Sequence, residues 1–284
     1  MSKKTVLITG CSNGGLGATM AKVYHAKGFH VFAGLRNKAK VGSLAEIDGI
    51  DIVEIEVTSV ESIRHCADLI AKETGGTLDI LVNNAGVGAV VPLLDASLDD
   101  AKKVYDANVW SIVAMAQAFA PMLIKAKGTM CNISSVSGEM VFAWSGIYSS
   151  SRSAATRISE TLRLEMAPLG VRVVTVILGG VETNGNNPAN IPDLELPPTS
   201  YYRKITSVID RHKKTQVHPN KQNIDIAAKN VVEDVLNGNS IFIRRGQAST
   251  ISWLCNTFLP YGMFTNMINK DSALGEIGFS DKSA

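Results

Sequence analysis

The sequence predicts an α/β fold, a Rossmann-type doubly wound parallel sheet of about seven strands in a single domain. Short apolar or β-branched runs alternate with helical patterns through the first half of the chain, as strands and crossover helices do in a parallel sheet. The first run ends in a glycine cluster, and later runs end in hydroxyl or amide residues. Open α/β sheets bind ligands at the carboxyl edge, so these residues mark the expected site.

The composition limits the classes of function. The chain has 284 residues, 45% hydrophobic and 19% charged, and no Pro/Gly/Ser linker divides it. The net charge is only +2 and no aromatics are interleaved with the basic clusters, so we expect no nucleic-acid partner. The four cysteines form no ligand or disulfide pattern, so no metal is expected. No signal-peptide core precedes the first strand, which predicts a cytoplasmic protein.

A glycine-rich turn separates the first predicted strand from the first predicted helix. The β-branched run Thr5–Thr9 precedes this turn, and a helical pattern follows it to about residue 27. Backbone N–H groups and a helix N-terminus in this arrangement bind the phosphates of a dinucleotide. The residues expected to contact the dinucleotide here are Gly10, Ser12, Asn13, Gly15, Leu16 and Gly17.

The end of the second predicted strand indicates which dinucleotide binds. His30–Leu35 ends without an acidic residue, and Arg36 follows it. An acid at this point binds the ribose hydroxyls of NAD, whereas a basic residue pairs with the 2′-phosphate of NADP. Ser12 and Asn13 can add hydrogen bonds to that phosphate. The sequence therefore predicts NADP(H), with Arg36 as a binding residue.

Three further segments follow in the expected order. Residues 51–57 alternate as a third strand, 59–74 form a helical pattern, and 78–82 read as a fourth strand. Asn84, Ala85 and Gly86 come next, and the small side chains of the last two let the chain pass close under a cofactor. A long helix is expected at 97–126, with Asn108 partway along it.

Two hydroxyl residues and one cation form the candidate catalytic group. An apolar run at 130–133 ends in hydroxyls and a helical pattern begins near residue 146, which places Ser135 at a strand end and Tyr148 in a first helical turn. Arg152 lies four residues after Tyr148, on the same helix face. A neighbouring cation can bring the tyrosine pKa down from about 10 towards neutrality, as acid–base catalysis requires. The core-facing stripe of this helix is expected at Ala154, Ile158, Leu162 and Met166.

These motifs, in this order and spacing, resemble the short-chain dehydrogenase/reductase family over roughly residues 5–245. The family uses a serine, a tyrosine, a lysine four residues later and an upstream asparagine, and its asparagine bends the long helix. The resemblance implies catalytic roles for Asn108, Ser135, Tyr148 and Arg152, and cofactor contacts for the last two as well. It also implies an adenine contact near Glu56 and Val57 and a homodimer or homotetramer. The chain departs from the family in having Arg152 where the lysine stands and one extra residue in the glycine turn.

The second half of the chain is expected to complete the site. A sixth strand at 171–178 leads into Gly180, Val181 and Thr183, which by resemblance pass the nicotinamide. Residues 184–200 lack periodicity and predict a substrate loop, followed by helices at 200–214 and 223–236 and a last strand at 240–244. These segments close a dinucleotide-binding unit at 1–250.

The remaining residues, 251–284, form an apolar extension and tail. The stretch 251–268 is shorter than the roughly 20 residues that span a bilayer, so it predicts a helix pair that covers the substrate or contacts a lipid or membrane surface.

Three classes of function stay open. Within the family the chain looks most like fungal 1-acyldihydroxyacetone-phosphate reductase-like proteins, which share its residues 123–128 and 179–181. Similar proteins also act in fungal secondary metabolism. The leading hypothesis is NADPH-dependent reduction of a carbonyl on a lipid-like or secondary-metabolite substrate. The alternatives are a non-redox isomerase, dehydratase or cyclase that uses Tyr148 as the acid, because Arg152 replaces lysine, and a catalytically silent binding protein.

Overall fold

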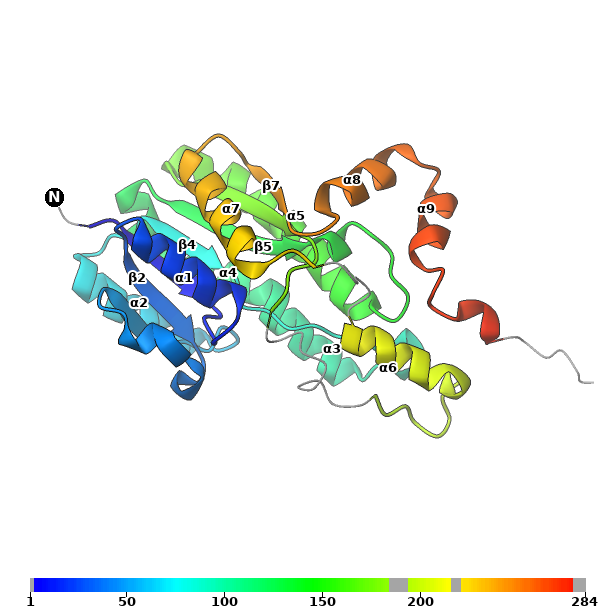
Figure 1. Cartoon of the computed structure of the whole chain (residues 1–284). Coiled ribbons are helices and arrows are strands. Elements are labelled where there is room, and N and C mark those ends of the chain that lie inside the picture. Colours follow the sequence, from blue (N-terminus) through cyan, green and yellow to red (C-terminus); the bar gives the residue numbers. More distant parts are fainter. Residues whose placement is uncertain (1–2, 184–193, 216–220, 278–284) are drawn as a thin grey trace, which may run out of the picture.

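A seven-stranded parallel sheet, ordered β3-β2-β1-β4-β5-β6-β7, forms the centre of the molecule (Figure 1). It is seen in a computed structural model that describes residues 3–183, 194–215 and 221–277. The strands are β1 (Thr5–Thr9), β2 (His30–Leu35), β3 (Ile50–Glu54), β4 (Ile80–Asn83), β5 (Thr129–Ser135), β6 (Arg172–Leu178) and β7 (Phe242–Arg245). The predicted fold class and number of strands are confirmed.

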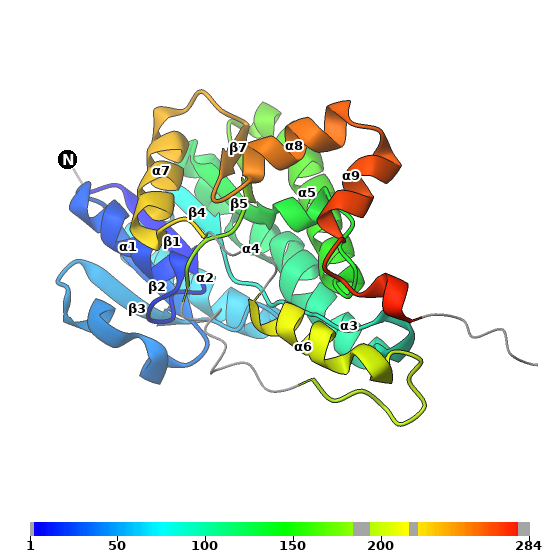
Figure 2. The same ribbon diagram turned by 45° about the vertical axis from the view of Figure 1, so that its right-hand side comes forward.

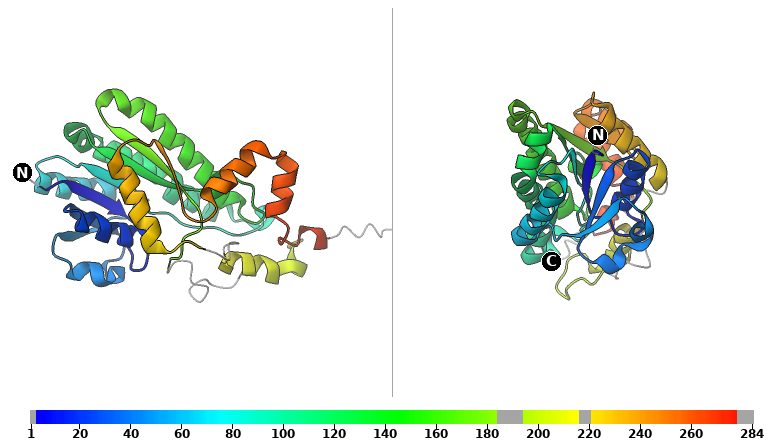
Figure 3. Two further views of the ribbon diagram at one scale, coloured as in Figure 1. Left: turned by 45° about the horizontal axis from the view of Figure 1, so that its top comes forward. Right: turned by 90° about the vertical axis from the view of Figure 1, so that its left-hand side faces the viewer.

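Helices cover both faces of the sheet (Figure 3). The α-helices of the described residues are α1 (Leu16–Ala26), α2 (Val60–Thr74), α3 (Leu98–Tyr105), α4 (Ser111–Ala126), α5 (Gly146–Met166), α6 (Thr206–Thr215), α7 (Ile224–Asn237), α8 (Ser249–Phe258) and α9 (Tyr261–Ile268). Helices α1 and α7 pack together on one face, and α2, α4 and α5 lie on the other. With both faces covered, strands such as β1 are buried at every position, which explains their continuous apolar runs.

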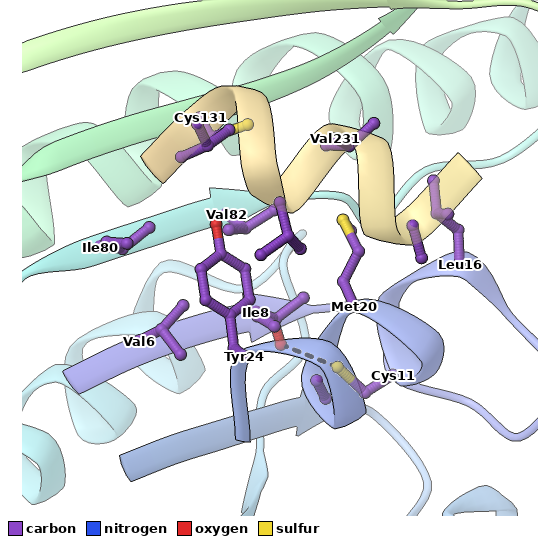
Figure 4. Packing of buried hydrophobic residues seen from close by; sticks show 14 of the residues in the cluster. Val6, Ile8, Cys11, Leu16, Met20, Tyr24, Ile80, Val82, Cys131 and Val231 are labelled. Carbon is purple, nitrogen blue, oxygen red and sulfur yellow. Dashed lines mark hydrogen bonds between the residues drawn. The ribbon is translucent and has the colours of Figure 1, made fainter. Parts of the chain in front are cut away.

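The core on the α1 and α7 side is close-packed. Figure 4 shows Tyr24 of α1 among Val6 and Ile8 of β1, with Val231 of α7 nearby. Leu7 of β1 points to the opposite face and joins the cluster under α2 and α4, because side chains alternate along a strand. Burial raises the pKa of the Cys131 thiol in this core to about 12, so it acts as a packing group and not as a nucleophile.

The ligand-binding crevice follows from the strand order. The chain runs outward from β1 through β2 to β3 and then returns to β4 on the other side of β1. The loops after β1 and β4 therefore diverge and leave a crevice at the carboxyl edge of the sheet. Helices α6, α8 and α9 gather at this same end of the molecule (Figures 1 and 2).

The predicted long helix is interrupted at Asn108. Helices α3 and α4 are joined by a π-helical turn, Asp106–Trp110, whose hydrogen bonds span one residue more than those of an α-helix. The continuous stretch Leu98–Ala126 is long and apolar enough to cross a membrane by length and composition, but 56% of its most apolar window is buried inside the protein. A core helix of a folded domain has these properties too.

The predicted core stripe of α5 is confirmed at Leu162 and Met166, which pack in the core cluster under α2 and α4, and is wrong at Ala154 and Ile158. Ala154 and Ile158 are only half-buried, whereas Arg152, Ala155 and Ser159 are buried. The sheet beneath α5 is polar here, which explains the difference. Asn132 donates to the Ser159 hydroxyl at 2.8 Å, and the Ser159 and Thr175 hydroxyls lie 2.7 Å apart. The face that carries Arg152 is thus the one that meets the sheet.

Two glycines allow the segments after β6 and β7 to touch. A Cβ at Gly179 would overlap the carbonyl oxygen of Gln247, and Gly246 lies against the backbone of Gly179. We expect Gly179→Ala to lower the free energy of unfolding by roughly 3 kcal/mol, since backbone atoms must separate. In Gly262→Ala the new methyl meets no atom within 4 Å, so stability should stay the same or rise by up to about 1 kcal/mol. Urea unfolding compares the two variants, and equal midpoints would contradict the close contact.

Candidate active site

The glycine turn between β1 and α1 is shaped for a close-lying ligand. Gly10 and Gly14 have φ values of +76° and +71°, in the left-handed region that favours glycine. Gly15 is the N-cap residue at the start of α1. A Cβ at Gly17 would lie 2.6 Å from the Gly10 carbonyl oxygen. The turn therefore stays narrow and points the α1 N-terminus at the crevice.

Asn84 joins the turn after β4 to the end of β1. Its side-chain Nδ2 donates to the Thr9 carbonyl oxygen at 2.8 Å, and the backbone N–H groups of Asn84 and Ala85 both donate to the Thr9 hydroxyl at 3.0 Å. A Cβ at Gly10 would lie 2.9 Å from the same Nδ2. Asn84 and Ala85 thus lie directly beside the glycine turn.

Arg36 already has a partner in this structure. Its side chain is 78% exposed, and its Nη1 lies 3.2 Å from Oε2 of Glu56. The other carboxylate oxygen of Glu56 accepts from the backbone and hydroxyl of Thr58. Burial alone would raise the pKa of Glu56, but the bonds from Thr58 and Arg36 outweigh it and hold the pKa below its usual value. Val57 beside it packs against the α2 and α4 core cluster.

Two further cations near Arg36 were missed from the sequence. Lys38 and Lys40 form a short 3-10 helix after β2, and both are exposed. The carbonyl oxygen of Lys40 accepts from the N–H of Asn13 at 2.8 Å, which places this helix against the glycine turn. Basic residues stand at every second position from Arg36 to Lys40, and this pattern could have identified the two lysines from the sequence.

Ser135 and Tyr148 meet across the gap between β5 and α5. Ser135 is the last residue of β5, and Tyr148 lies in the first turn of α5. Burial raises the pKa of the Tyr148 phenol, but the Arg152 charge and hydrogen bonds from Ser135 and Arg152 together bring it below its ordinary value. The Cζ atom of Arg152 lies 5.2 Å from the Tyr148 ring centroid. The predicted serine, tyrosine and cation are thus brought together.

Arg152 is held inside the protein by neutral groups. Only 9% of it is exposed, and its Nη1 donates to the Ile133 carbonyl oxygen at 3.2 Å. Its Nε has no hydrogen-bond partner, and no carboxylate of the described residues lies within 4.0 Å of it. A Cβ at Gly86 would overlap Nη2 of Arg152. The guanidinium therefore occupies the space that the missing side chain of Gly86 leaves.

Asn108 is bound on both sides of its amide. Its Oδ1 accepts from the Val87 N–H at 2.8 Å, and its Nδ2 donates to the Val87 carbonyl oxygen at 2.9 Å and to the Ser151 hydroxyl at 3.0 Å. Both N–H bonds are thus used within the protein. A Cβ at Gly86 would lie 2.9 Å from Oδ1, so Asn108 and Arg152 approach the same point of the chain.

The segment after β6 closes the other side of the crevice. Gly180 is bridged to Gln247 and Val181 to Gln222, and Val181 is buried. Thr183 is partly buried next to them. Of the predicted substrate loop, residues 184–193 lie outside the described residues. In the remaining part, the Leu194 N–H donates to Asp210 of α6, which joins this part to the helix.

The predicted apolar helix pair in the extension is confirmed as α8 and α9. Several of its side chains are exposed, namely Ile251, Trp253, Leu254, Phe258, Tyr261, Met263 and Met267.

Three side chains of types that can bind a metal lie close together at the opposite, amino-terminal edge of the sheet. The ligand atoms of His30, Asp51 and Glu73 lie within 4.8 Å of one another. His30 and Asp51 are hydrogen-bonded at 2.5 Å. The three residues are distant in sequence, and they take no part in the crevice.

Comparison with known proteins agrees with this geometry. The family description "short chain dehydrogenase" matches residues 4–193. The short-chain dehydrogenase cctT of Talaromyces islandicus is 82% identical over 97% of this chain and 98% of its own length. The NADPH-dependent 1-acyldihydroxyacetone phosphate reductase of Schizosaccharomyces pombe is 36% identical over 73% of this chain and 71% of its own length. The predicted likeness to such reductases is therefore distant.

A solved structure shares the fold. The short-chain dehydrogenase from Burkholderia cenocepacia J2315, in complex with NADP, superposes with a TM-score of 0.74 at 23% identity, covering 94% of this chain and 98% of that one. The family match includes the glycine turn, Asn108, Ser135 and Tyr148. The chain belongs to the short-chain dehydrogenase/reductase family of oxidoreductases.

Proposed function

We propose that this enzyme reduces a ketone or other carbonyl on an apolar, lipid-like or secondary-metabolite substrate with NADPH. The observation that carries the proposal is the contact of Ser135, Tyr148 and Arg152 at the carboxyl edge of the sheet, where the pKa of the tyrosine is lowered. We further propose that the protein is cytoplasmic and, on the family resemblance alone, that it forms a homo-oligomer.

The crevice fits a nicotinamide dinucleotide. A Cβ at Gly10 or Gly17 would meet Asn84 or the turn itself, so these glycines keep the turn tight beside the α1 N-terminus, an arrangement that binds the phosphates of a dinucleotide. The unpartnered Nε of Arg152 fits a ribose hydroxyl. Such a cofactor would supply the hydride for the carbonyl carbon. The residues that would hold it are Gly10, Ser12, Asn13, Gly15, Leu16, Gly17, Arg36, Glu56, Val57, Asn84, Ala85, Gly86, Tyr148, Arg152, Gly180, Val181 and Thr183.

The protein residues would then manage the charge on the substrate oxygen. Ser135 can donate its hydroxyl hydrogen to the carbonyl oxygen and polarise it. Tyr148 gives its proton to that oxygen as negative charge develops, so the product is an alcohol and the phenol becomes a phenolate. Arg152 stabilises the phenolate, and its charge acts strongly because the guanidinium is largely shielded from water.

Apolar side chains border this group. Val87 follows Gly86 directly and is 45% exposed. Leu93 packs against Gly146, two residues before Tyr148, and is 62% exposed. Val141 lies between Ser135 and Tyr148 in sequence and is also exposed. These surfaces support an apolar substrate, and the exposed side chains of α8 and α9 support the proposal that the extension covers it or contacts a lipid surface.

Substitutions at position 152 test the reaction class. Arginine keeps the charge beside Tyr148, but it stays protonated and Asn108 has no free N–H to pass protons onward. We expect slow reduction in the parent, an equal or higher rate in Arg152→Lys, a large loss in Arg152→Met, and no turnover in Tyr148→Phe. NADPH oxidation with a panel of apolar ketones measures this. If the parent binds NADPH but oxidises none while Arg152→Lys does, the non-redox alternative becomes the better explanation.

The pH dependence of the reduction rate should follow the ionisation of the Tyr148 phenol. Tyr148 must be protonated to act as donor, so the rate is highest below its pKa and falls as the pH rises through it. That pKa is lowered, so the falling limb should lie below about pH 10. Arg152→Met removes the charge and leaves the burial, which should move the limb of the residual activity to higher pH. The test is to measure the reduction rate against pH for the parent and for Arg152→Met. If the rate falls at the same pH in both, Arg152 does not set the pKa of Tyr148.

Arg36 should set the preference for NADPH. Its exposed ion pair with Glu56 is worth at most about 1 kcal/mol, less than a bidentate bond to a 2′-phosphate. Arg36→Ala should weaken NADPH binding about tenfold and leave NADH binding nearly unchanged. Glu56→Gln frees the guanidinium and should strengthen NADPH binding. Fluorescence titration measures both cofactors, with the remote surface variant Arg157→Ala as control. Equal affinities in the parent would contradict the preference.

A further inference from the structure

The loop between Ser135 and Tyr148 contains an unusual backbone conformation. Residues 139–145 connect the short helix after β5 to α5. Within this loop, Trp144 has a φ of +67°, in the left-handed region. A bulky side chain rarely adopts this conformation, which persists only where surrounding contacts enforce it. The contacts that hold Trp144 are therefore informative about the site.

The first of these contacts comes from the C-terminal extension. Asn269, directly after α9, accepts from the Ala143 N–H through Oδ1 at 2.7 Å. Its Nδ2 donates to the Val141 carbonyl oxygen at 2.8 Å. One amide side chain thus binds the loop backbone at two points, as a neighbouring strand would. These two bonds hold the loop from a position more than 120 residues downstream.

Trp144 itself is enclosed by the same extension and by the α6 segment. Its indole N–H donates to the Ser272 carbonyl oxygen at 3.2 Å. Its ring stands edge-on to Tyr202 with centroids 5.2 Å apart, and it packs against Ile205 and Ile209. On the other side, the Trp144 carbonyl oxygen accepts from the Val91 N–H at 2.7 Å. Trp144 is 7% exposed, so these contacts enclose it almost completely.

The extension also joins the loop to α6 and to β7. A ring nitrogen of His212 in α6 lies 2.9 Å from the Asp271 carbonyl oxygen. At the start of the loop, both oxygens of Glu139 accept from Arg244 of β7, whose guanidinium lies over Trp253 of α8. The loop is therefore fixed at its beginning by β7 and α8 and at its end by residues 269–272.

We infer that Asn269 and Trp144 are positioning residues for catalysis, through which the C-terminal extension sets the placement of Tyr148 relative to Ser135. The inference rests on the proposed function. The loop leads into α5 only two residues before Tyr148. A shift of about 1 Å in a catalytic group can cost on the order of a hundredfold in rate. If the extension only covered the substrate, disturbing it would instead mainly raise the Michaelis constant for the substrate.

Two variants test this inference in the full-length protein. Asn269→Ala removes both loop bonds, and Trp144→Phe keeps an aromatic ring but removes the N–H donor to Ser272. Each should lower kcat for an apolar ketone about tenfold or more, shift the falling limb of the pH profile, and leave the Kd for NADPH within about twofold. Asn256→Ala, an exposed asparagine of α8, is the matched control and should behave as the parent does.

Hydrogen exchange supplies a measurement that does not depend on activity. The peptide covering residues 139–147 should exchange faster in Asn269→Ala than in the parent, while peptides from β1 and α1 stay unchanged. The inference is overturned if exchange of the loop is unchanged, or if kcat is retained and only the Michaelis constant rises. A parent that binds NADPH but reduces no ketone contradicts the proposed function instead, and the exchange result then decides alone whether Asn269 holds the loop.

Discussion

Arg152 carries a positive charge into the protein with 9% of its surface exposed, and no carboxylate within 4.0 Å among the described residues balances it. A buried charge without a partner is costly, and the groups that offset it here are a carbonyl oxygen and the face of the Tyr148 ring. The positive charge that these groups leave uncompensated stabilises any negative charge nearby. The phenolate of Tyr148 is the anion that the protein itself can provide, so the cost of burying Arg152 is linked to the acidity of Tyr148.

The neighbouring elements are shaped around this guanidinium. Gly86 has no side chain where Arg152 lies, and the π-helical turn brings Asn108 to the same place. The Ser134 hydroxyl donates to the Arg152 carbonyl oxygen at 3.0 Å and ties α5 to the end of β5. A planar guanidinium fills this space differently from a linear ammonium group. The substitution of the family lysine therefore affects the geometry of the whole group and not one contact.

Much of the fold could be predicted because its signals are local. The apolar run of β1, the glycine turn and the start of α5 at residue 146 depend on neighbouring residues. Ser135 and Tyr148 were identified because strand ends and helix starts place them at one edge. The sheet-facing side of α5 before Leu162 was assigned wrongly, because it pairs Ser159 with buried polar groups of β5 and β6, a pattern that hydrophobic periodicity cannot detect.

Contacts between residues far apart in the sequence could not be predicted from hydrophobic periodicity or motif spacing. Arg36 and Glu56 are both visible in the sequence, but their ion pair depends on how the loops after β2 and β3 meet. The same holds for Asn269, whose amide finds its partners only when α9 has docked. Polar pairs of this kind have no period and no characteristic spacing.

The bonds of Asn269 to the loop also have a consequence for the order of folding. Its partners lie 126 and 128 positions upstream, so the loop before Tyr148 gains them only through a contact of very long sequence separation. Contacts of this kind form slowly, because a large loop must close before they contribute. During synthesis, β5 and α5 can therefore assemble while residues 139–145 still lack this support. Acid–base competence would then be one of the last properties that the growing chain acquires.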